Sequence, residues 1–259
     1  MTQNDTPIKA PSDKQYWAII PAAGVGKRMG TKIPKQYLPL CGKTVLEQTL
    51  SIFLKHPDIN GIIIAVTEGD PYWQEISANY NHSNDAAHTP DNKPVLVAAG
   101  GAERCHSVLN ALTELSKHAA VNDWVLVHDA ARPCLTSGDI DRLIGQLSKT
   151  SSGGLLGLPM ADTVKRCDKN LQVIETVERS ELWRALTPQM FPLKLLKDAL
   201  EQAINNNALV TDEASAIELQ GLKPQMVEGQ PGNIKITHPG DLQLAELFYT
   251  QTGLSTHAT

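Results

Sequence analysis

Six short runs of apolar, mostly β-forming residues recur along the chain, and segments with helical periodicity lie between most of them. The runs fall at 17–20, 61–66, 95–98, 124–127, 154–158 and 225–227, and the helical segments at 44–55, 103–115, 136–147 and 193–204. Continuous apolar runs are typical of strands buried on both faces. Because a strand that alternates with a helix returns by a right-handed crossover, this order predicts an α/β fold. We expect a mostly parallel sheet that helices cover on both faces.

Two later segments begin with residues that favour helix starts. Thr211-Asp-Glu-Ala-Ser and the segment 236–241 both offer hydroxyl or acidic capping groups, so each predicts a further helix. Between the fifth run and these segments the strand–helix rhythm breaks. Segments 163–167 and 173–177 have the character of two strands around the turn 168–170. We therefore predict a β-arm over 159–183 that projects from the sheet and contacts a neighbouring subunit.

The length and composition predict one domain. The chain has 259 residues, of which 41% are hydrophobic and 20% charged, enough to bury a full core. We place a single domain at 17–250, a disordered tail at 1–16 and a short tail at 251–259. Residues 77–93 are poor in apolar side chains and predict an exposed loop.

Charge and apolar patterning exclude two classes of partner. The formal net charge is -5 and the pI is near 5.9, which argues against a broad basic surface for nucleic acid. The longest apolar runs are far shorter than the roughly 20 residues that span a bilayer. The four cysteines are widely separated and no secretory segment is recognised, so we expect free thiols and a cytoplasmic protein. Anionic ligands must then meet a local cluster of Lys and Arg.

A glycine-rich loop follows the first run and predicts phosphate binding. The loop places Gly24, Gly26 and Gly30 around Lys27 and Arg28, so that main-chain N–H groups and two cations can approach phosphate oxygens. Its G-x-G-x-x-x-G spacing differs from the dinucleotide fingerprint, and it lacks the glycine and hydroxyl positions of the Walker A motif. The alternative is that the glycines only form a tight turn. Lys35, held after Pro34, adds a third cation near the same strand end.

Polar and small residues also follow other runs of the predicted sheet. The segments 99–104 and 128–133 come directly after two strands. Because ligands of open α/β sheets bind outside the carboxyl ends of the strands, we expect these segments to share one face with the glycine-rich loop. His128, His106 and Cys105 are metal-ligand types, but their spacing fits no common zinc pattern. We therefore predict no protein-held metal there.

Seven ordered motifs carry a resemblance to a known family. They are PAAGxGxRM from Pro21, PKQY from Pro34, GGxERxxS ending at Ser107, HDAARP from His128, ALTPQ ending at Gln189, TDEAS from Thr211 and NIKIT from Asn233. Their combination, over about 17–247, closely resembles 2-C-methyl-D-erythritol 4-phosphate cytidylyltransferases. The resemblance implies a Rossmann-like nucleotidyltransferase fold and a homodimer. It also implies transfer of CMP from CTP to methylerythritol phosphate, with Mg²⁺ held mainly by the CTP phosphates, in the non-mevalonate isoprenoid pathway.

The resemblance also implies roles for particular residues. Arg28 and Lys35 would stabilise the transition state, while Arg179 and Lys235 would position the incoming phosphate. The nucleotide would contact Ala22, Ala23, Gly24, Gly26, Lys27, Gly100, Gly101, Ser107, Asp129 and Ala130. The second substrate would contact Asp129, Arg132, Thr163, Arg179, Thr187, Thr211 and Lys235.

Alternatives to these assignments exist at several positions. Asp129 and Arg132 are also spaced to form an ion pair that braces a turn, and isolated threonines are more often caps or strand residues. The family usually has Asp where this chain has Ala102. The alternative activity is a cytidylyltransferase for another polyol phosphate, such as ribitol 5-phosphate, and the alternative of another class is an inactive nucleotide-binding protein.

Overall fold

A central sheet of seven strands organises the computed structural model, which describes residues 14–24, 33–80 and 93–251. The strand order is β11-β7-β10-β6-β1-β4-β5. The strands are β1 (Tyr16–Pro21), β4 (Ile59–Val66), β5 (Val95–Ala99), β6 (Trp124–Val127), β7 (Gly154–Pro159), β10 (Trp183–Pro192) and β11 (Gln225–Glu228). Six of these seven were expected close to their observed bounds, and β10 was not expected. The mostly parallel α/β architecture is confirmed.

The unexpected strand, β10, runs antiparallel to both of its neighbours, β6 and β7. Its sequence contains Thr187, Pro188 and Gln189 in place of a continuous apolar run. The pairing with β7 shifts register between Ala185 and Gln189, where the proline interrupts the strand. Burial between two other strands, not local β-propensity, makes this segment a strand.

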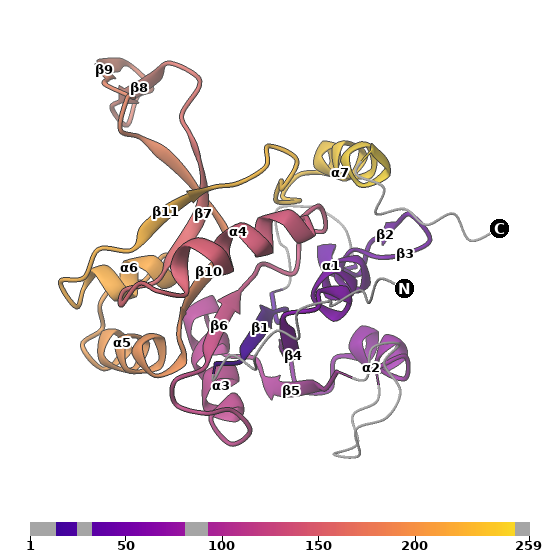
Figure 1. Ribbon diagram of the computed structural model, residues 1–259. Coiled ribbons are helices and arrows are strands. Elements are labelled where there is room, and N and C mark those ends of the chain that lie inside the picture. Colours follow the sequence, from indigo (N-terminus) through magenta and orange to yellow (C-terminus); the bar gives the residue numbers. More distant parts are fainter. Residues whose placement is uncertain (1–13, 25–32, 81–92, 252–259) are drawn as a thin grey trace, which may run out of the picture.

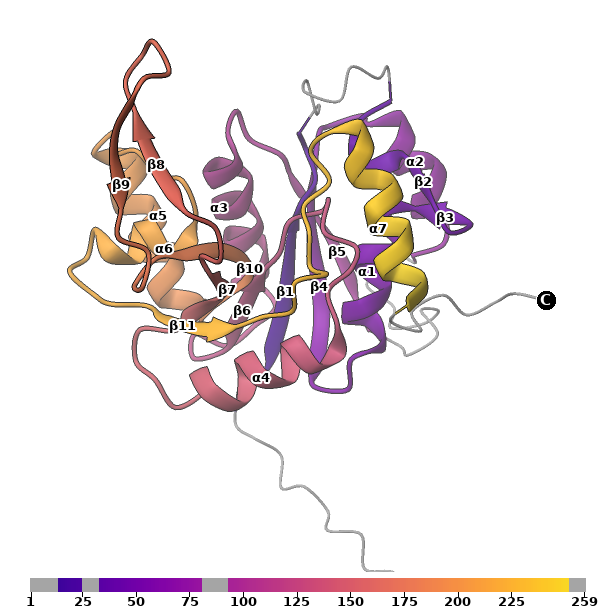
Figure 2. The same ribbon diagram turned by 90° about the horizontal axis from the view of Figure 1, so that it is seen from above.

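Helices cover both faces of the sheet (Figure 2). They are α1 (Val45–Lys55), α2 (Pro71–Ser77), α3 (Arg104–Leu115), α4 (Ser137–Leu147), α5 (Leu193–Asn205), α6 (Glu213–Glu218) and α7 (Pro239–Gln251), with a 3-10 turn η2 (Lys35–Tyr37). Alternate residues of β1 enter opposite cores. Ala18 and Ile20 pack with α1 and α4, whereas Trp17 and Ile19 pack with α3, α5 and α6. The predicted two-sided covering is therefore confirmed.

Helix starts follow the local sequence closely. Thr44 caps α1 in a capping box with Glu47, and Thr136 does the same for α4 with Asp139. The short helix α2 and a small hairpin of β2 (Pro39–Leu40) and β3 (Lys43–Thr44) were not expected. Most of the segment predicted as a loop at 77–93 lies outside the described residues.

The last helix packs against the chain segment that follows β6. Ala245 and Tyr249 of α7 share a third apolar cluster with Ala131 and Ile236. The Ile236 amide donates to the Ala131 carbonyl at 2.9 Å. Through these contacts α7 holds the segment 233–237 beside the carboxyl end of β6.

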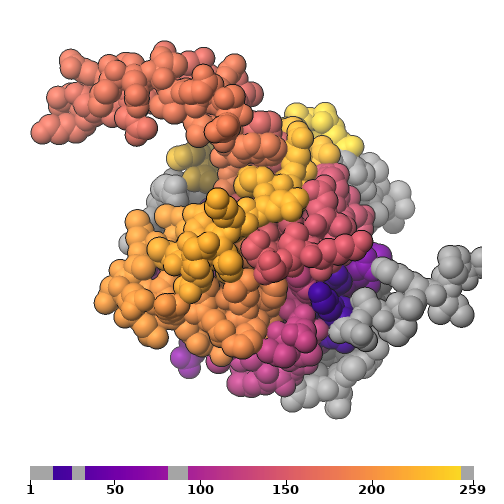
Figure 3. All heavy atoms as spheres, turned by 60° about the vertical axis from the view of Figure 1, so that its left-hand side comes forward, coloured from indigo at the N-terminus to yellow at the C-terminus, as the bar shows by residue number. Residues whose placement is uncertain are grey.

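A hairpin projects from the body, as predicted (Figures 1 and 3). It consists of β8 (Val164–Cys167) and β9 (Val173–Val177), which pair antiparallel in a sheet of their own. Asp168 closes the turn because its side chain accepts from the Asn170 and Gln172 amides at 2.9 Å. The arm leaves apolar side chains exposed, among them Val173 and Ile174 at 61% and 63%. In the described ranges, every helix is too short or too polar to cross a membrane.

Candidate active site

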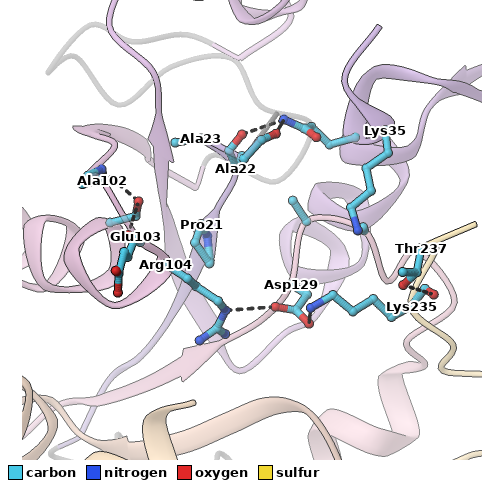
Figure 4. A pocket seen from close by; sticks show the side chains of 16 residues that line it. Pro21, Ala22, Ala23, Lys35, Ala102, Glu103, Arg104, Asp129, Lys235 and Thr237 are labelled. Atoms are coloured by element: carbon cyan, nitrogen blue, oxygen red, sulfur yellow. Dashed lines mark hydrogen bonds and ion pairs between the residues drawn. The ribbon is translucent and has the colours of Figure 1, made fainter. Parts of the chain in front are cut away.

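A cavity of about 380 Å³ lies at the carboxyl ends of β1 and β6, beside the start of α3 (Figure 4). It is lined by Pro21, Ala22, Ala23, Gly24, Lys35, Gln36, Gly101, Ala102, Glu103, Arg104, Ser107, Asp129, Ala130, Ala131, Lys235 and Thr237. The three segments that follow β1, β5 and β6 therefore share one cavity, as the rule for open α/β sheets predicts.

Two loops line one side of this cavity, and contacts to their main chain hold them in place. The Gln36 side chain donates to the carbonyl oxygens of Ala22 and Gly24 at 2.8 and 2.9 Å, which fixes the start of the glycine-rich loop. Gly100 packs against this loop, because a Cβ at Gly100 would overlap that of Ala23. The amide of Gly101 donates to Ser107 Oγ at 2.9 Å. These backbone turns present small residues and peptide groups to a ligand.

Asp129 lies at the centre of a cluster of cations. Its Oδ1 accepts from Arg104 Nε at 3.1 Å, and its Oδ2 lies 2.9 Å from Lys235 Nζ and 3.3 Å from Arg132 Nε. The Asp129 side chain is 9% exposed. The ion pair with Arg132, the alternative to substrate binding, is therefore present, and it is one of three cation contacts of Asp129.

The charges around Asp129 keep its carboxyl group ionised. Burial disfavours the charged form, but Arg104, Lys235 and Arg132 outweigh burial and hold the pKa of the Asp129 carboxyl far below its usual range. Burial also disfavours the charge of Arg132 and lowers its pKa, and the negative charge of Asp129 partly offsets this effect. Burial also opposes the charge of Arg104, yet its two carboxylate partners, Glu213 and Asp129, raise its pKa. Asp129, Arg104 and Arg132 are therefore charged near neutral pH.

Sequence reasoning assigned no role to Arg104 or Glu213. Arg104 Nη1 and Nη2 bind the two oxygens of Glu213 at 2.5 and 3.1 Å, while Arg104 Nε binds Asp129. Arg104 was visible as part of a family motif, but nothing in the sequence indicates that Glu213, 109 residues away, is its partner. Only the packing of α6 against the sheet brings the two together.

His128 and Thr187 form hydrogen bonds that fix the backbone of Asp129. His128 Nε2 lies 3.0 Å from the Arg132 carbonyl, which can only accept, so this nitrogen carries the proton. Burial lowers the pKa of His128 to about 4, so near neutral pH Nδ1 is a bare acceptor. The Thr187 hydroxyl therefore donates to Nδ1 at 2.9 Å and accepts from the Asp129 amide at 3.1 Å. That Thr187 contacts a substrate stays a prediction.

Two further contacts join separate segments at the rim. Lys35 Nζ donates to the Ile236 carbonyl at 2.7 Å, which places this ammonium beside the segment that carries Lys235. Arg132 Nη1 donates to the Asn233 carbonyl at 2.7 Å. The predicted cations Lys35, Arg132 and Lys235 thus lie around one site.

Other predicted residues lie apart from the cavity or outside the described ranges. Thr163 and Arg179 are exposed residues of the arm region, where Arg179 Nη1 donates to the Ala161 carbonyl. Thr211 is exposed just before α6. The predictions for Gly26, Lys27 and Arg28 lie outside the described residues.

Metal-ligand groups occur at two places near the cavity. Among the described residues, Glu103, Cys105 and His106 place ligand-type atoms within 4.8 Å of one another at the start of α3. Asp129 is a carboxylate in the cavity, but both of its oxygens already accept from cations. A hard cation such as Mg²⁺ prefers oxygen ligands and commonly takes most of them from substrate phosphates, which this cation-lined cavity is suited to receive.

Comparisons with known proteins show the family to which the chain belongs. The sequence model of the 2-C-methyl-D-erythritol 4-phosphate cytidylyltransferase family (IspD) matches residues 16–251. The enzyme of that name from Hahella chejuensis is 50% identical over 241 residues, which cover 93% of this chain and 95% of the relative. The one from Pseudomonas aeruginosa is 49% identical over 243 residues, covering 93% and 96%.

Solved structures also superpose on the chain. A crystal structure of 4-diphosphocytidyl-2C-methyl-D-erythritol synthase superposes with a TM-score of 0.76 at 37% identity, covering 92% of this chain and 99% of that one. The Francisella tularensis 2-C-methyl-D-erythritol 4-phosphate cytidylyltransferase superposes with a TM-score of 0.74 at 38% identity, covering 91% and 100%. With its sheet order, its cavity and these matches, the chain belongs to the IspD family of 2-C-methyl-D-erythritol 4-phosphate cytidylyltransferases.

Proposed function

We propose that this enzyme transfers CMP from CTP to 2-C-methyl-D-erythritol 4-phosphate in the non-mevalonate route to isoprenoid precursors. The products are 4-diphosphocytidyl-2-C-methyl-D-erythritol and pyrophosphate. Family membership over residues 16–251 supports the reaction. The observation that carries the assignment to this cavity is the cluster in which Arg104, Arg132 and Lys235 surround Asp129.

The reaction needs charge stabilisation more than a protein nucleophile. A phosphate oxygen of methylerythritol phosphate attacks the α-phosphorus of CTP, and the bond to the leaving pyrophosphate breaks. That oxygen is already ionised near pH 7, because the second pKa of a phosphate monoester is about 6. Repulsion between the two anions and the charge of the transition state must then be offset by cations and positioned donors. The buried His128 is neutral and has both ring nitrogens engaged, so it is not available as a base.

The nucleotide is proposed to lie across the two small-residue loops. Ala22, Ala23 and Gly24 would face the CTP, and Gly100, Gly101 and Ser107 would frame the cytosine. The short Gly101–Ser107 contact and the close packing of Gly100 on the first loop support this placement. Recognition through peptide groups does not depend on the side chain at position 102, so Ala102 is compatible with this placement.

Four cations are proposed to bind phosphate, two at the CTP phosphates and two at the phosphate of methylerythritol phosphate. Lys35 and Arg28 would stabilise charge on the CTP phosphates, the role of Arg28 resting on the sequence alone. Lys235 of one chain and Arg179 of the arm would position the incoming phosphate. The Lys35–Ile236 contact supports the first assignment for Lys35, because it brings that ammonium to the same rim as Lys235.

Mg²⁺ is proposed as the metal cofactor, held mainly by the CTP phosphates. When bound, it neutralises part of the triphosphate charge. The oxygen-rich ligand and the small set of protein carboxylates in the cavity fit this use of the metal.

The arm is proposed to form a homodimer and to complete each active site. We treat residues 17–250 as one domain, because the seven strands of the central sheet, from β1 to β11 in the sequence, belong to one sheet, and residues 159–183 as an arm that leaves it. Arg179 and Thr163 lie on this arm and away from the cavity of their own chain. Their proposed contact with substrate is therefore made in the partner subunit.

The enzyme is proposed to work in the cytoplasm. All four cysteines are free thiols, as expected for a protein of a reducing compartment.

A substrate panel tests the proposed reaction. Purified enzyme with CTP and Mg²⁺ is incubated with methylerythritol phosphate, ribitol 5-phosphate or no acceptor, and released pyrophosphate is measured. We expect turnover that depends on methylerythritol phosphate, and much less with ribitol 5-phosphate. Equal or faster turnover with ribitol 5-phosphate would overturn the substrate assignment.

A further inference from the structure

The first residue of α6, Glu213, carries a buried carboxylate. Glu213 is 1% exposed, and both of its oxygens bind the guanidinium of Arg104, which lines the active-site cavity. Such a paired fork fixes the plane as well as the position of the guanidinium. Glu213 is not among the cavity-lining residues, so its effect on a ligand must pass through Arg104.

The start of α6 is itself fixed to the central sheet. The buried Gln189 of β10 donates to Asp212 Oδ2 at 2.9 Å and accepts from the Ala214 amide at 2.8 Å. Asp212 also caps the helix by accepting from the Ser215 amide at 3.0 Å. Glu213 therefore lies between two residues that Gln189 holds, and its carboxylate has a defined place.

The contacts continue from Glu213 to Lys235. Arg104 uses Nη1 and Nη2 on Glu213 and Nε on Asp129 Oδ1. The other oxygen of Asp129, Oδ2, binds Lys235 Nζ at 2.9 Å and Arg132 Nε at 3.3 Å. If Glu213 loses its charge, the guanidinium has Asp129 as its remaining carboxylate among the contacts described. Arg104 would then turn toward Asp129 and compete with Lys235 for it.

Charge balance leads to the same conclusion. Three cations, Arg104, Arg132 and Lys235, face two carboxylates, Asp129 and Glu213, so the cluster has a net charge of +1. Glu213 compensates Arg104 and leaves the attraction of Asp129 available to hold Lys235 at the cavity. Without that compensation the cluster would carry +2, and mutual repulsion would displace the most exposed cation, Lys235, whose side chain is 40% exposed.

We propose that Glu213 is a positioning residue for the methylerythritol phosphate site, acting through Arg104 and Asp129 on Lys235. This proposal rests on the proposed function, in which Lys235 contacts the incoming phosphate. Glu213 touches neither substrate nor the reacting atoms.

The test is a comparison of Michaelis constants for the two substrates. Glu213→Gln keeps the shape and an oxygen acceptor but removes the charge. We expect KM for methylerythritol phosphate to rise about tenfold or more, by analogy with residues that orient metal ligands from behind, while KM for CTP changes little. Glu218→Gln is the matched control, because Glu218 is an exposed carboxylate at the other end of the same helix. Both constants should stay at their wild-type values in this control.

A second background tests the route through Arg104. In an Arg104→Gln enzyme, adding Glu213→Gln should change KM for methylerythritol phosphate by less than about twofold, because residues that act through one contact are not additive. If Glu213→Gln raises KM for methylerythritol phosphate equally in the wild-type and Arg104→Gln enzymes, its effect does not pass through Arg104. A lower melting temperature with both KM values unchanged would reduce Glu213 to a structural role and overturn the proposal.

Two further outcomes keep the test decisive. If Glu213→Gln does not fold, Glu213→Asp keeps the charge but shortens the fork, and the same selective rise in KM is expected at smaller size. Unchanged constants in a folded Glu213→Asp, if Glu213→Gln does not fold, overturn the proposal. Failure of the proposed function is distinguishable, because the wild-type enzyme itself would then show no turnover with methylerythritol phosphate.

Discussion

Replacing Asp129 by Asn should reveal how strongly the cation cluster depends on one carboxylate. Asn keeps the size of the side chain but removes the charge that faces Arg104, Arg132 and Lys235 at 3.1, 3.3 and 2.9 Å. The three cations would then face Glu213 alone, and the local net charge would rise from +1 to +2. The variant should therefore be less stable than the wild type.

The size of the effect follows from burial. Removing one partner of a buried ion pair costs about 3–5 kcal/mol. Two of the partner side chains here keep solvent contact, since Lys235 is 40% and Arg104 29% exposed, and solvent screens such pairs. We therefore expect Asp129→Asn to lower the free energy of unfolding by about 2–4 kcal/mol.

The pH dependence has a definite sign. The pKa of the Asp129 carboxyl is lower in the folded protein than in the unfolded chain, so its stabilising contribution is present above the unfolded pKa and is lost as pH falls toward the folded value. The difference in stability between wild type and variant should be constant between about pH 5 and 8 and should shrink only below about pH 4, near the unfolded pKa of Asp.

Urea denaturation at several pH values is the assay. Asp198→Asn is the control, because Asp198 forms an exposed pair with Lys194 at 2.6 Å and such pairs contribute little. An Asp129→Asn midpoint equal to that of the wild type, or a stability difference that changes between pH 5 and 8, would refute the reasoning.

Two other predictions concern the nucleotide loops and the arm. Gly100→Ala should raise KM for CTP, because the new Cβ would overlap that of Ala23 and push the glycine-rich loop away. The control is Gly145→Ala within α4, where a Cβ would meet no atom within 4 Å, so the kinetic constants should not change. Ile174→Glu on the arm should convert the proposed dimer to monomers in sedimentation equilibrium and abolish turnover. The control is Leu209→Glu, which changes an apolar side chain that is 86% exposed and should leave the dimer intact. An Ile174→Glu enzyme that is monomeric and active would contradict an active site shared between subunits.

Local sequence predicted much of the fold because its signals lie within single elements. The apolar run of β4 and the Thr44 and Thr136 capping boxes of α1 and α4 specify structure over a few residues. The strand β10 does not, since its Thr187, Pro188 and Gln189 lack a strand pattern and become a strand only between β6 and β7. The hairpin of the arm was readable because two β-rich segments flank a polar turn.

For the site, the sequence by itself indicated the small-residue loops, the cations Lys35, Arg132 and Lys235 and, through ordered motifs, the kind of reaction. The loops follow strand ends, which the rule for open α/β sheets places on one face. Only the tertiary structure decided which charges pair. Asp129, Arg104 and Glu213 come from three segments, and Glu213 reaches Arg104 across 109 residues of chain. The strength of an ion pair depends on distance and burial in space. No local sequence pattern encodes these quantities, so only the packing of α6 and the sheet identifies the partner of each cation.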